Sequence, residues 1–269
     1  MRIEPGSAWS VRIGDLWEFR GIFYFLVWRD LKVRYRQTVF GAVWAVLQPL
    51  SLMLVFALFA GRFLHAPSQG VPYYLFAYAA LVPWTLLSQA LTNSSESLIR
   101  DKNLVSKVFF PRVLLPAASA VSFVFDYLVA AALLIVMAAF SDVHPDVGAL
   151  FWFPVLSLML FALAVAVAVW LSALNVMYRD VRYAVPLIAQ VWLFASPIAY
   201  PITAVPEAWR NVYALNPMVG IVTSFRDAAL GIGDPASSYL GISALVTAGL
   251  LVSGMLYFRR VDRLFADVI

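Results

Sequence analysis

The chain has 269 residues, of which 63% are hydrophobic and 13% are charged, and its formal net charge is +4. Soluble domains are about 25% charged, so this composition indicates a polytopic membrane protein. The positive charges lie between apolar segments, which is typical of membrane topology and not of nucleic-acid binding. The chain has no cysteine and only two histidines, so disulfides, thiolate metal sites and zinc-like ligand spacing are excluded.

The N-terminal segment, residues 8–28, mixes apolar and charged side chains and ends in a short aromatic run. The run is too short to cross a bilayer, and the mixture predicts an amphipathic helix that lies in the membrane interface. A solvated N-terminal arm is the alternative. A cleavable signal peptide is not expected, because no small-residue cleavage site follows the run.

The next stretch joins a basic run to a membrane-length apolar segment. Lys and Arg crowd residues 29–36, and residues 39–60 that follow carry no formal charge. At a rise of 1.5 Å per residue, such a segment covers about 30 Å, the thickness of the hydrocarbon core of a bilayer. Because Lys and Arg gather at the cytoplasmic end of a span, the stretch predicts a crossing with the N-terminus inside.

Further apolar segments predict an all-α membrane protein, one domain over residues 1–269, with six transmembrane helices. The expected spans are residues 39–60, 73–91, 113–140, 150–174, 184–202 and 239–258. Of the 19 Lys and Arg in the chain, only Arg62, Arg210 and Arg226 fall in segments that this layout places outside. Both termini are therefore predicted to be cytoplasmic.

Two short helices are expected before the last span. Residues 206–215 and 218–230 each have a helical pattern, and they are split at Asn216 and Pro217 because proline disfavours helix in the residue before it. Both pieces are too polar to span and too apolar for a free loop. We expect re-entrant or interfacial helices on the outer side.

Several enzyme motifs are missing from the sequence. It contains no phosphate-binding loop, no H-E-x-x-H and no G-x-S-x-G. Any uphill transport therefore draws its energy from a partner chain or an ion gradient. An ion-coupled carrier is expected to bury several ionisable groups in the membrane, whereas the predicted spans hold one, Asp126.

Asp126 shares a helix face with Ser119 and Ser122. One interpretation is a channel-lining or gating acid, and the other is a structural acid that is hydrogen-bonded inside the bundle. Two other faces combine an amide with aromatic rings, and rings can stack on sugars while amides bond their hydroxyl groups. Together with Asp126, the candidates for a sugar path are Trp44, Gln48, Phe59, Tyr183, Gln190 and Phe194. Ordinary helix packing, with glutamines joining helices, is the alternative.

Four segments carry a family resemblance: WRDLKVRYRQTVFGAVWAVLQPL, NLVSKVFFPRVLLP, LSALNVMYRDVRYAVP and the run from ASPIAYPI to YALNPM. Together they resemble the permease subunit of ABC-2 type polysaccharide exporters, a family that includes O-antigen, teichoic-acid and capsule transporters. The resemblance covers residues 16–230 in the same order and spacing. It is specific to the family and not to one substrate.

The resemblance implies a homodimer that works with two copies of a separate cytoplasmic ATPase. That partner would bind ATP and Mg²⁺, and no cofactor is expected in this chain. The implied substrate is a lipid-linked polysaccharide, moved across the inner membrane of a bacterium. An ABC-2 permease for a drug or a lipid is one alternative. A membrane enzyme acting on lipid-linked sugars is another, although the sequence lacks an acid–base constellation for it.

By the same resemblance, the N-terminal helix and the loop over residues 93–112 meet the ATPase. Residues 97–107 are amphipathic and suit a small coupling helix, with a charged topology anchor as the alternative. The candidate ATPase contacts are Arg100, Lys102, Leu104, Val105 and Lys107. The candidates for a cytoplasmic gate or for headgroup contacts, which could equally be plain anchors, are Arg29, Asp30, Arg34, Arg179 and Asp180. The helices over residues 206–230 correspond to the outer gate helices of the family.

Overall fold

A computed structural model describes residues 17–36, 38, 41, 43–108, 110–141, 143, 148, 151–262 and 265. Every regular element in this part of the chain is a helix, which confirms the all-α prediction. The helices are α2 (Arg20–Tyr35), α3 (Val43–Phe56), η1 (Ala57–Phe63), α4 (Tyr73–Ser95), α5 (Ser97–Arg100), α6 (Lys102–Lys107), α7 (Leu114–Val121), α8 (Val124–Ala139), α10 (Trp152–Met177), α11 (Val181–Phe194), η2 (Ile202–Ala204), α12 (Glu207–Tyr213), α13 (Pro217–Leu230) and α14 (Ser238–Val261). Residues 8–16 of the predicted interface helix lie outside the described residues, as do parts of the predicted first span.

Five helical stretches in the described part of the chain are long and apolar enough to cross a membrane. They are Val43–Phe63, Tyr73–Ser95, Leu114–Ala139, Trp152–Met177 and Ser238–Val261. A sixth apolar helix, α11, has only 14 residues. The predicted fifth span, residues 184–202, extended past Phe194, where α11 ends. The helix stops there because Pro197 follows closely, and proline restricts the residue before it and lacks an N–H.

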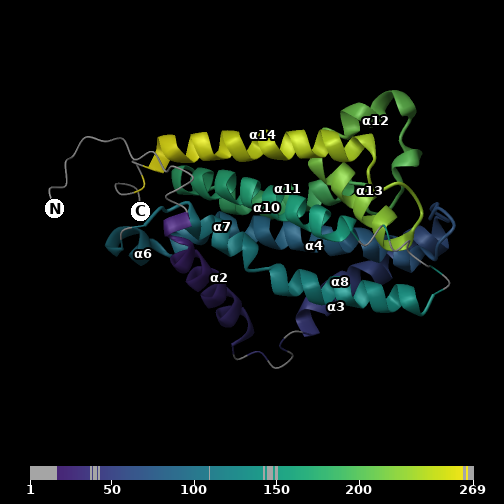
Figure 1. The fold of residues 1–269 in the computed structure, drawn as a ribbon, viewed down its shortest axis with the longest axis horizontal. Helices are drawn as coiled ribbons and strands as arrows, with labels where there is room; N and C mark the ends of the chain where they lie inside the picture. Colours follow the sequence, from purple (N-terminus) through teal and green to yellow (C-terminus); the bar gives the residue numbers. More distant parts are fainter. Residues whose placement is uncertain are drawn as a thin grey trace.

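The bundle is long, and its two ends are different (Figure 1). Helix α6 lies at one end and α12 at the other, while α14 runs along one side of the bundle. Helix α2 crosses the α6 end obliquely, on the side away from α14. Sequence neighbours α12 and α13 are split at Asn216, as predicted, and the Asn216 side chain caps α13 by accepting from Met218 N at 3.1 Å.

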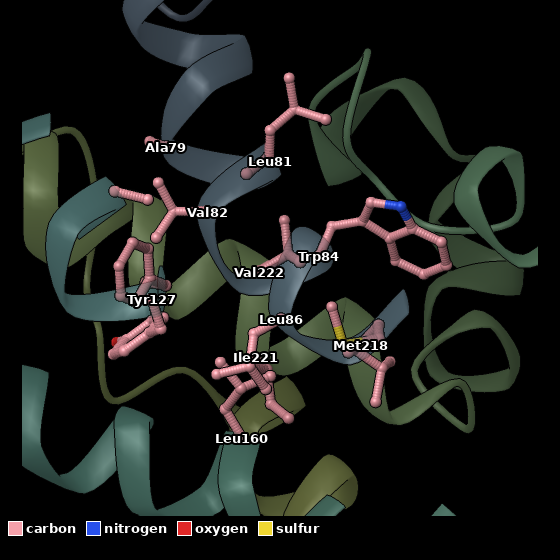
Figure 2. Close-up of a cluster of buried hydrophobic side chains, with 14 of the residues drawn as sticks. Ala79, Leu81, Val82, Trp84, Leu86, Tyr127, Leu160, Met218, Ile221 and Val222 are labelled. Carbon is pink, nitrogen blue, oxygen red and sulfur yellow. The ribbon is translucent and has the colours of Figure 1, made fainter. Parts of the chain in front are cut away.

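Helix α4 is the centre of the bundle. Its side chains are buried without interruption from Leu75 to Trp84. Figure 2 shows this core, in which α4 residues meet Tyr127 of α8, Leu160 of α10 and Ile221 of α13. Close packing of this kind holds membrane helices together, because lipid tails are as apolar as the side chains themselves.

Small residues allow the closest helix contacts. A Cβ on Gly220 of α13 would overlap the Tyr239 carbonyl of α14, and the Gly220 N–H donates to Ser243 Oγ at 3.0 Å. Gly254 of α14 lies in the same way against the Trp170 ring of α10. Helix α13, the second of the short helices predicted near the outer side, is therefore buried along its whole length.

Candidate functional site

A cavity of about 310 Å³ lies between the end of α2 and helices α3, α4 and α8. Its walls combine aromatic rings, amides, hydroxyl groups and one ion pair. The lining residues are Arg34, Tyr35, Thr38, Gly41, Trp44, Ala45, Gln48, Val82, Thr85, Leu86, Gln89, Asn93, Phe123, Asp126, Tyr127 and Ala130. We call it the amide cavity. It brings together three of the predicted path residues and one predicted gate residue.

The ion pair of the amide cavity joins α2 to α8. Arg34 Nη1 donates to Asp126 Oδ2 at 2.8 Å, and Arg34 Nη2 donates to Ser122 Oγ at 2.8 Å. The guanidinium also lies over the Phe123 ring, with Cζ 3.5 Å from its centroid. These contacts are possible because α7 ends at Val121 and α8 begins at Val124, so that the Ser122 carbonyl also accepts from Arg34. Asp126 therefore lines the cavity and is also paired in the bundle.

The amides of the cavity come from two helices. Gln89 of α4 donates through Nε2 to Gln48 Oε1 of α3, and Gln89, Thr85 and Asn93 lie on one face of α4 because they are four residues apart. Trp44, one turn before Gln48, is 56% exposed. Two buried polar atoms, Tyr35 OH and Asp126 Oδ1, have no hydrogen-bond partner among the described residues.

The other predicted path residues lie outside the amide cavity. Phe59 is in η1 and packs edge-on against Phe63, with ring centroids 5.9 Å apart. Tyr183, Gln190 and Phe194 follow one outward face of α11, where the two aromatic side chains are 68% and 62% exposed. The structure thus divides the predicted path residues between the cavity and the outward faces of α11 and η1.

A cluster of four charged side chains joins α2 to the turn between α5 and α6, in the first half of the predicted ATPase segment. Arg29 Nη2 donates to Asp30 Oδ1 at 2.8 Å and to Asp101 Oδ2 at 2.7 Å. Arg100 Nη2 donates to Asp30 Oδ2 at 3.4 Å. Burial disfavours the charged form of Arg29, but the hydrogen bonds to Asp101 and Asp30 outweigh this cost and hold its pKa above the ordinary arginine value. Arg29 and Asp30 thus join α2 to the segment of α5 and α6, and their role at a gate or at headgroups stays a prediction.

The apolar face of the predicted coupling segment points into the protein itself. Val105 is 5% exposed and, with Leu98, belongs to a core cluster that includes Leu26 of α2, and Leu104 packs against the same cluster. A direct ATPase contact by the Val105 side chain would require this packing to open. Among the described side chains of this segment, Ile99, Arg100, Lys102, Asn103 and Lys107 are exposed, as is Val108 directly after it.

The second predicted gate pair, Arg179 and Asp180, lies in the turn between α10 and α11, and both side chains are exposed. The pattern in the sequence did not single out two residues that the structure makes prominent, Gln89 and Arg226. Gln89 could have been found from the polar spacing with Thr85 and Asn93. Arg226 carries no such signal, because its partners are backbone carbonyls.

In the part of the chain that the structure describes, several membrane-length helices enclose a polar cavity, an arrangement typical of multi-pass membrane proteins. Residues 22–230 match the family described as ABC-2 type transporter, and the chain belongs to this family. It is therefore the membrane subunit of an ABC transporter, in which a separate cytoplasmic subunit is the ATPase.

Curated relatives cover nearly the whole chain. It is 30% identical over 217 residues to the O-antigen export system permease protein RfbA of Myxococcus xanthus, covering 80% of this chain and 82% of that protein. It is 24% identical over 243 residues to RfbA of Klebsiella pneumoniae, covering 90% and 92%. It is 20% identical over 242 residues to the polysialic acid transport protein KpsM of Escherichia coli, covering 89% and 93%.

Proposed function

We propose that this chain exports a lipid-linked polysaccharide from the cytoplasmic to the outer face of a bacterial inner membrane. The observation that carries the proposal is the similarity, over most of the chain, to permeases named for O-antigen and for polysialic acid, which are both polysaccharides. The amide cavity supports it, because its rings, amides and hydroxyl groups suit a ligand rich in hydroxyl groups. In its ion pair the charges of Arg34 and Asp126 offset each other, which suits an uncharged sugar unit better than a free ion.

The proposed working unit contains two copies of this chain. Gln190 lies beside aromatic rings on the outward face of α11, and Gln48 of α3, which lines the amide cavity, is also exposed. An amide exposed to lipid would lose its hydrogen bonds with water. A second copy facing these helices would cover them and enclose a path between the copies. The candidate path residues Trp44, Phe59, Tyr183 and Phe194 would then face that path.

The proposed topology has six crossings, with α11 as the short one and both termini in the cytoplasm. The biased distribution of Lys and Arg supports this orientation. The end of the bundle with α5 and α6 is then cytoplasmic, and α12 and α13 are the outer gate helices. Tyr24, Phe25 and Trp28 form an exposed aromatic face on α2, which suits an interfacial position.

The proposed ATPase contact is the exposed edge of α5 and α6. Ile99 and Val108 are 42% and 48% exposed apolar side chains, and Lys102 and Lys107 lie beside them. Aspartate in place of Ile99 and Val108 should abolish co-purification of the cognate ATPase while the permease accumulates normally. Arg260→Glu, at the end of α14, is the matched charge change outside the contact. Normal ATPase binding by the double variant would contradict this contact surface.

Deletion of the gene in its own host tests the export function. We expect surface polysaccharide to disappear and the lipid-linked polymer to accumulate on the cytoplasmic side, since synthesis continues without export. A plasmid copy should restore the surface polymer only when the cognate ATPase is active. A deletion strain with normal surface polysaccharide and with altered resistance to a drug would instead indicate a different cargo.

A further inference from the structure

The backbone between α11 and η2 is irregular, although it is packed inside the bundle. We call residues 195–201 the outer break. Ser196, Pro197 and Ile198 are buried there, and Pro197 and Pro201 cannot donate a backbone hydrogen bond. Irregular backbone at membrane depth is tolerated only where other groups of the protein satisfy it. The carbonyls of the outer break therefore need donors from elsewhere.

Side chains supply these donors, almost carbonyl by carbonyl. Asn216 Nδ2 donates to the Ala195 carbonyl at 2.8 Å, and Tyr73 OH donates to the Ala199 carbonyl at 2.8 Å. Arg226 Nη2 donates to the carbonyls of Pro197 at 2.6 Å and Ile198 at 3.2 Å. The donors come from α4, from α13 and from the cap of α13. The outer break is thus held from one side, by α4, α13 and the cap of α13.

Arg226 is the central donor. Its side chain is only 1% exposed, and its Nε also donates to the Phe76 carbonyl of α4 at 3.2 Å. Its Cζ lies 3.7 Å from the centroid of the Phe76 ring. Among the described residues no ion pair joins it to a carboxylate. A buried arginine is costly and usually has a functional reason, and this one binds α13, α4 and the outer break together.

The other side of the outer break is held loosely. Tyr200 OH and Tyr213 OH share a hydrogen bond of 2.9 Å, which joins the outer break to α12. No residue of α12 is buried, and Trp209 and Val212 are 63% and 55% exposed. Segments with few buried contacts open at low free-energy cost. Tyr213, at the end of α12, packs against the cluster of Ile202, Ala214 and Val219, but no residue of α12 is itself buried. Of the two proposed gate helices, α12 is therefore the one that can move, and α13 stays packed against α4.

We propose that the outer break is a hinge at which α12 and the outer end of α11 move together. Arg226 stays in place and holds the hinge through its hydrogen bonds to the carbonyls. The carbonyls of the hinge accept hydrogen bonds from side chains and not from the N–H groups of a helix. The movement can therefore break and re-form these bonds without unwinding a helix. Phe194, the last residue of α11, ends the outward aromatic and amide face, so the movement opens or closes the outer end of that face. The proposal depends on the proposed export function only for the identity of what passes.

Cysteine labelling can test the hinge directly, because the chain has no native cysteine. The probe is a membrane-impermeant maleimide added from the outer side to the permease in complex with its ATPase. Ile198→Cys, at a site 1% exposed, should be unlabelled at rest and become labelled severalfold faster during ATP turnover. Ile221→Cys in α13, at a site 0% exposed, is the buried control and should stay unlabelled. Trp209→Cys is the exposed control and should react in every state.

Variants of Arg226 and of the Tyr200–Tyr213 pair sharpen the test. In the Ile198→Cys background, Arg226→Met should give labelling at rest, whereas Arg226→Lys should retain part of the protection because it keeps a cationic donor. Tyr213→Phe leaves Arg226 in place and should also raise labelling at rest severalfold. This variant decides the matter if Arg226→Met does not accumulate.

The outcomes separate the hinge from the exported substrate. Protection of Ile198→Cys in every state of an active complex would overturn the hinge, whatever is exported. If Tyr213→Phe does not raise the resting labelling of Ile198→Cys, then the hydrogen bond between Tyr200 and Tyr213 does not hold the hinge closed, and that part of the proposal is wrong. Labelling that follows turnover, in a complex that moves no polysaccharide, would support the hinge and contradict the proposed function.

Discussion

The outward face of α14 and the outward faces of α3 and α11 are all exposed in the isolated chain, but their chemistry is different. Along α14 the large exposed side chains are Leu245, Val252 and Leu256, and the exposed residues between them, Ala248 and Gly249, are small. Along α11 the exposed face carries Tyr183, Gln190 and Phe194, together with Leu187 and Val191. Helix α3 adds Trp44 and Gln48, which are exposed and also line the amide cavity. We call the α3 and α11 faces the polar side and the α14 face the apolar side.

Side chains that are exposed in the single chain can therefore lie in different environments in the membrane. Lipid tails suit the apolar side, because Leu245, Val252 and Leu256 have no side-chain group that needs a hydrogen bond. The polar side needs another protein surface or water, because each unsatisfied amide in hydrocarbon is costly. The difference favours an assembly in which the polar side faces inward.

The largest expected effect comes from placing a charge on each side. Val252→Arg puts a guanidinium on the apolar side within the last span, at a cost of about 3 kcal/mol. Gln190→Arg puts the same group on the polar side, where we expect water or protein. Accumulation of folded permease in membranes should fall strongly for Val252→Arg and little for Gln190→Arg, although the second variant should block export. Equal loss of both variants would show that lipid covers both sides.

The ion pair of the amide cavity should give the next largest effect. Asp126→Ala leaves Arg34 with its contacts to Ser122 and to the Phe123 ring, and loss of a hydrogen bond to a charged group costs about 2 kcal/mol. Thermal unfolding of the purified permease should therefore occur at a lower temperature. The double variant Arg34→Ala with Asp126→Ala should lose less than the sum of the two single variants, because the two residues interact. Additive losses would show that the pair contributes nothing as a pair.

Ring and amide truncations should change export more than stability. Trp44→Ala, Gln48→Ala and Tyr183→Ala remove side chains that are exposed in the single chain, so assembly with the ATPase should stay intact while polymer export decreases. Leu256→Ala on the apolar side is the matched truncation and should leave export normal. Loss of assembly by the polar-side variants would assign these residues to packing instead.

The smallest effect is expected at the charged cluster next to α2. The Arg100 side chain is 45% exposed, and its bond to Asp30 is long at 3.4 Å. Exposed ion pairs contribute well under about 1 kcal/mol, so Arg100→Ala should leave thermal stability unchanged. Arg29→Ala should lower it measurably, because Arg29 is less exposed and bonds both Asp30 and Asp101. Equal effects of the two variants would contradict this difference.

Periodicity and charge predicted the helices well, because they depend on local sequence. The split at Asn216 and Pro217 follows from one rule about proline, and the structure confirms it. The end of α11 at Phe194 was missed, because hydropathy continues through the outer break although the helix does not. What replaces the helix there is a set of side-chain donors from distant segments, which no local pattern can show.

The candidate site was predicted residue by residue but not as an arrangement. Arg34 and Asp126 were both singled out, for different roles, and their pairing depends on the angle at which α2 crosses the bundle. The amphipathic pattern of residues 97–107 is present, yet a pattern cannot tell which partner covers an apolar face. For Val105 that partner is the cluster of Leu26 and Leu98 in the chain itself.

The short length of α11 has a consequence for the membrane around it. A helix of 14 residues is about 21 Å long, whereas the hydrocarbon core of a bilayer is about 30 Å thick. A span shorter than the bilayer is accommodated by local thinning of the lipid or by protein that covers the difference. In the proposed topology the outer break and α12 continue from the outer end of α11, so we expect the outer leaflet beside α11 to be thinned or displaced by protein. A polar cargo that leaves along α11 would then meet a shorter hydrocarbon barrier than it would beside α14.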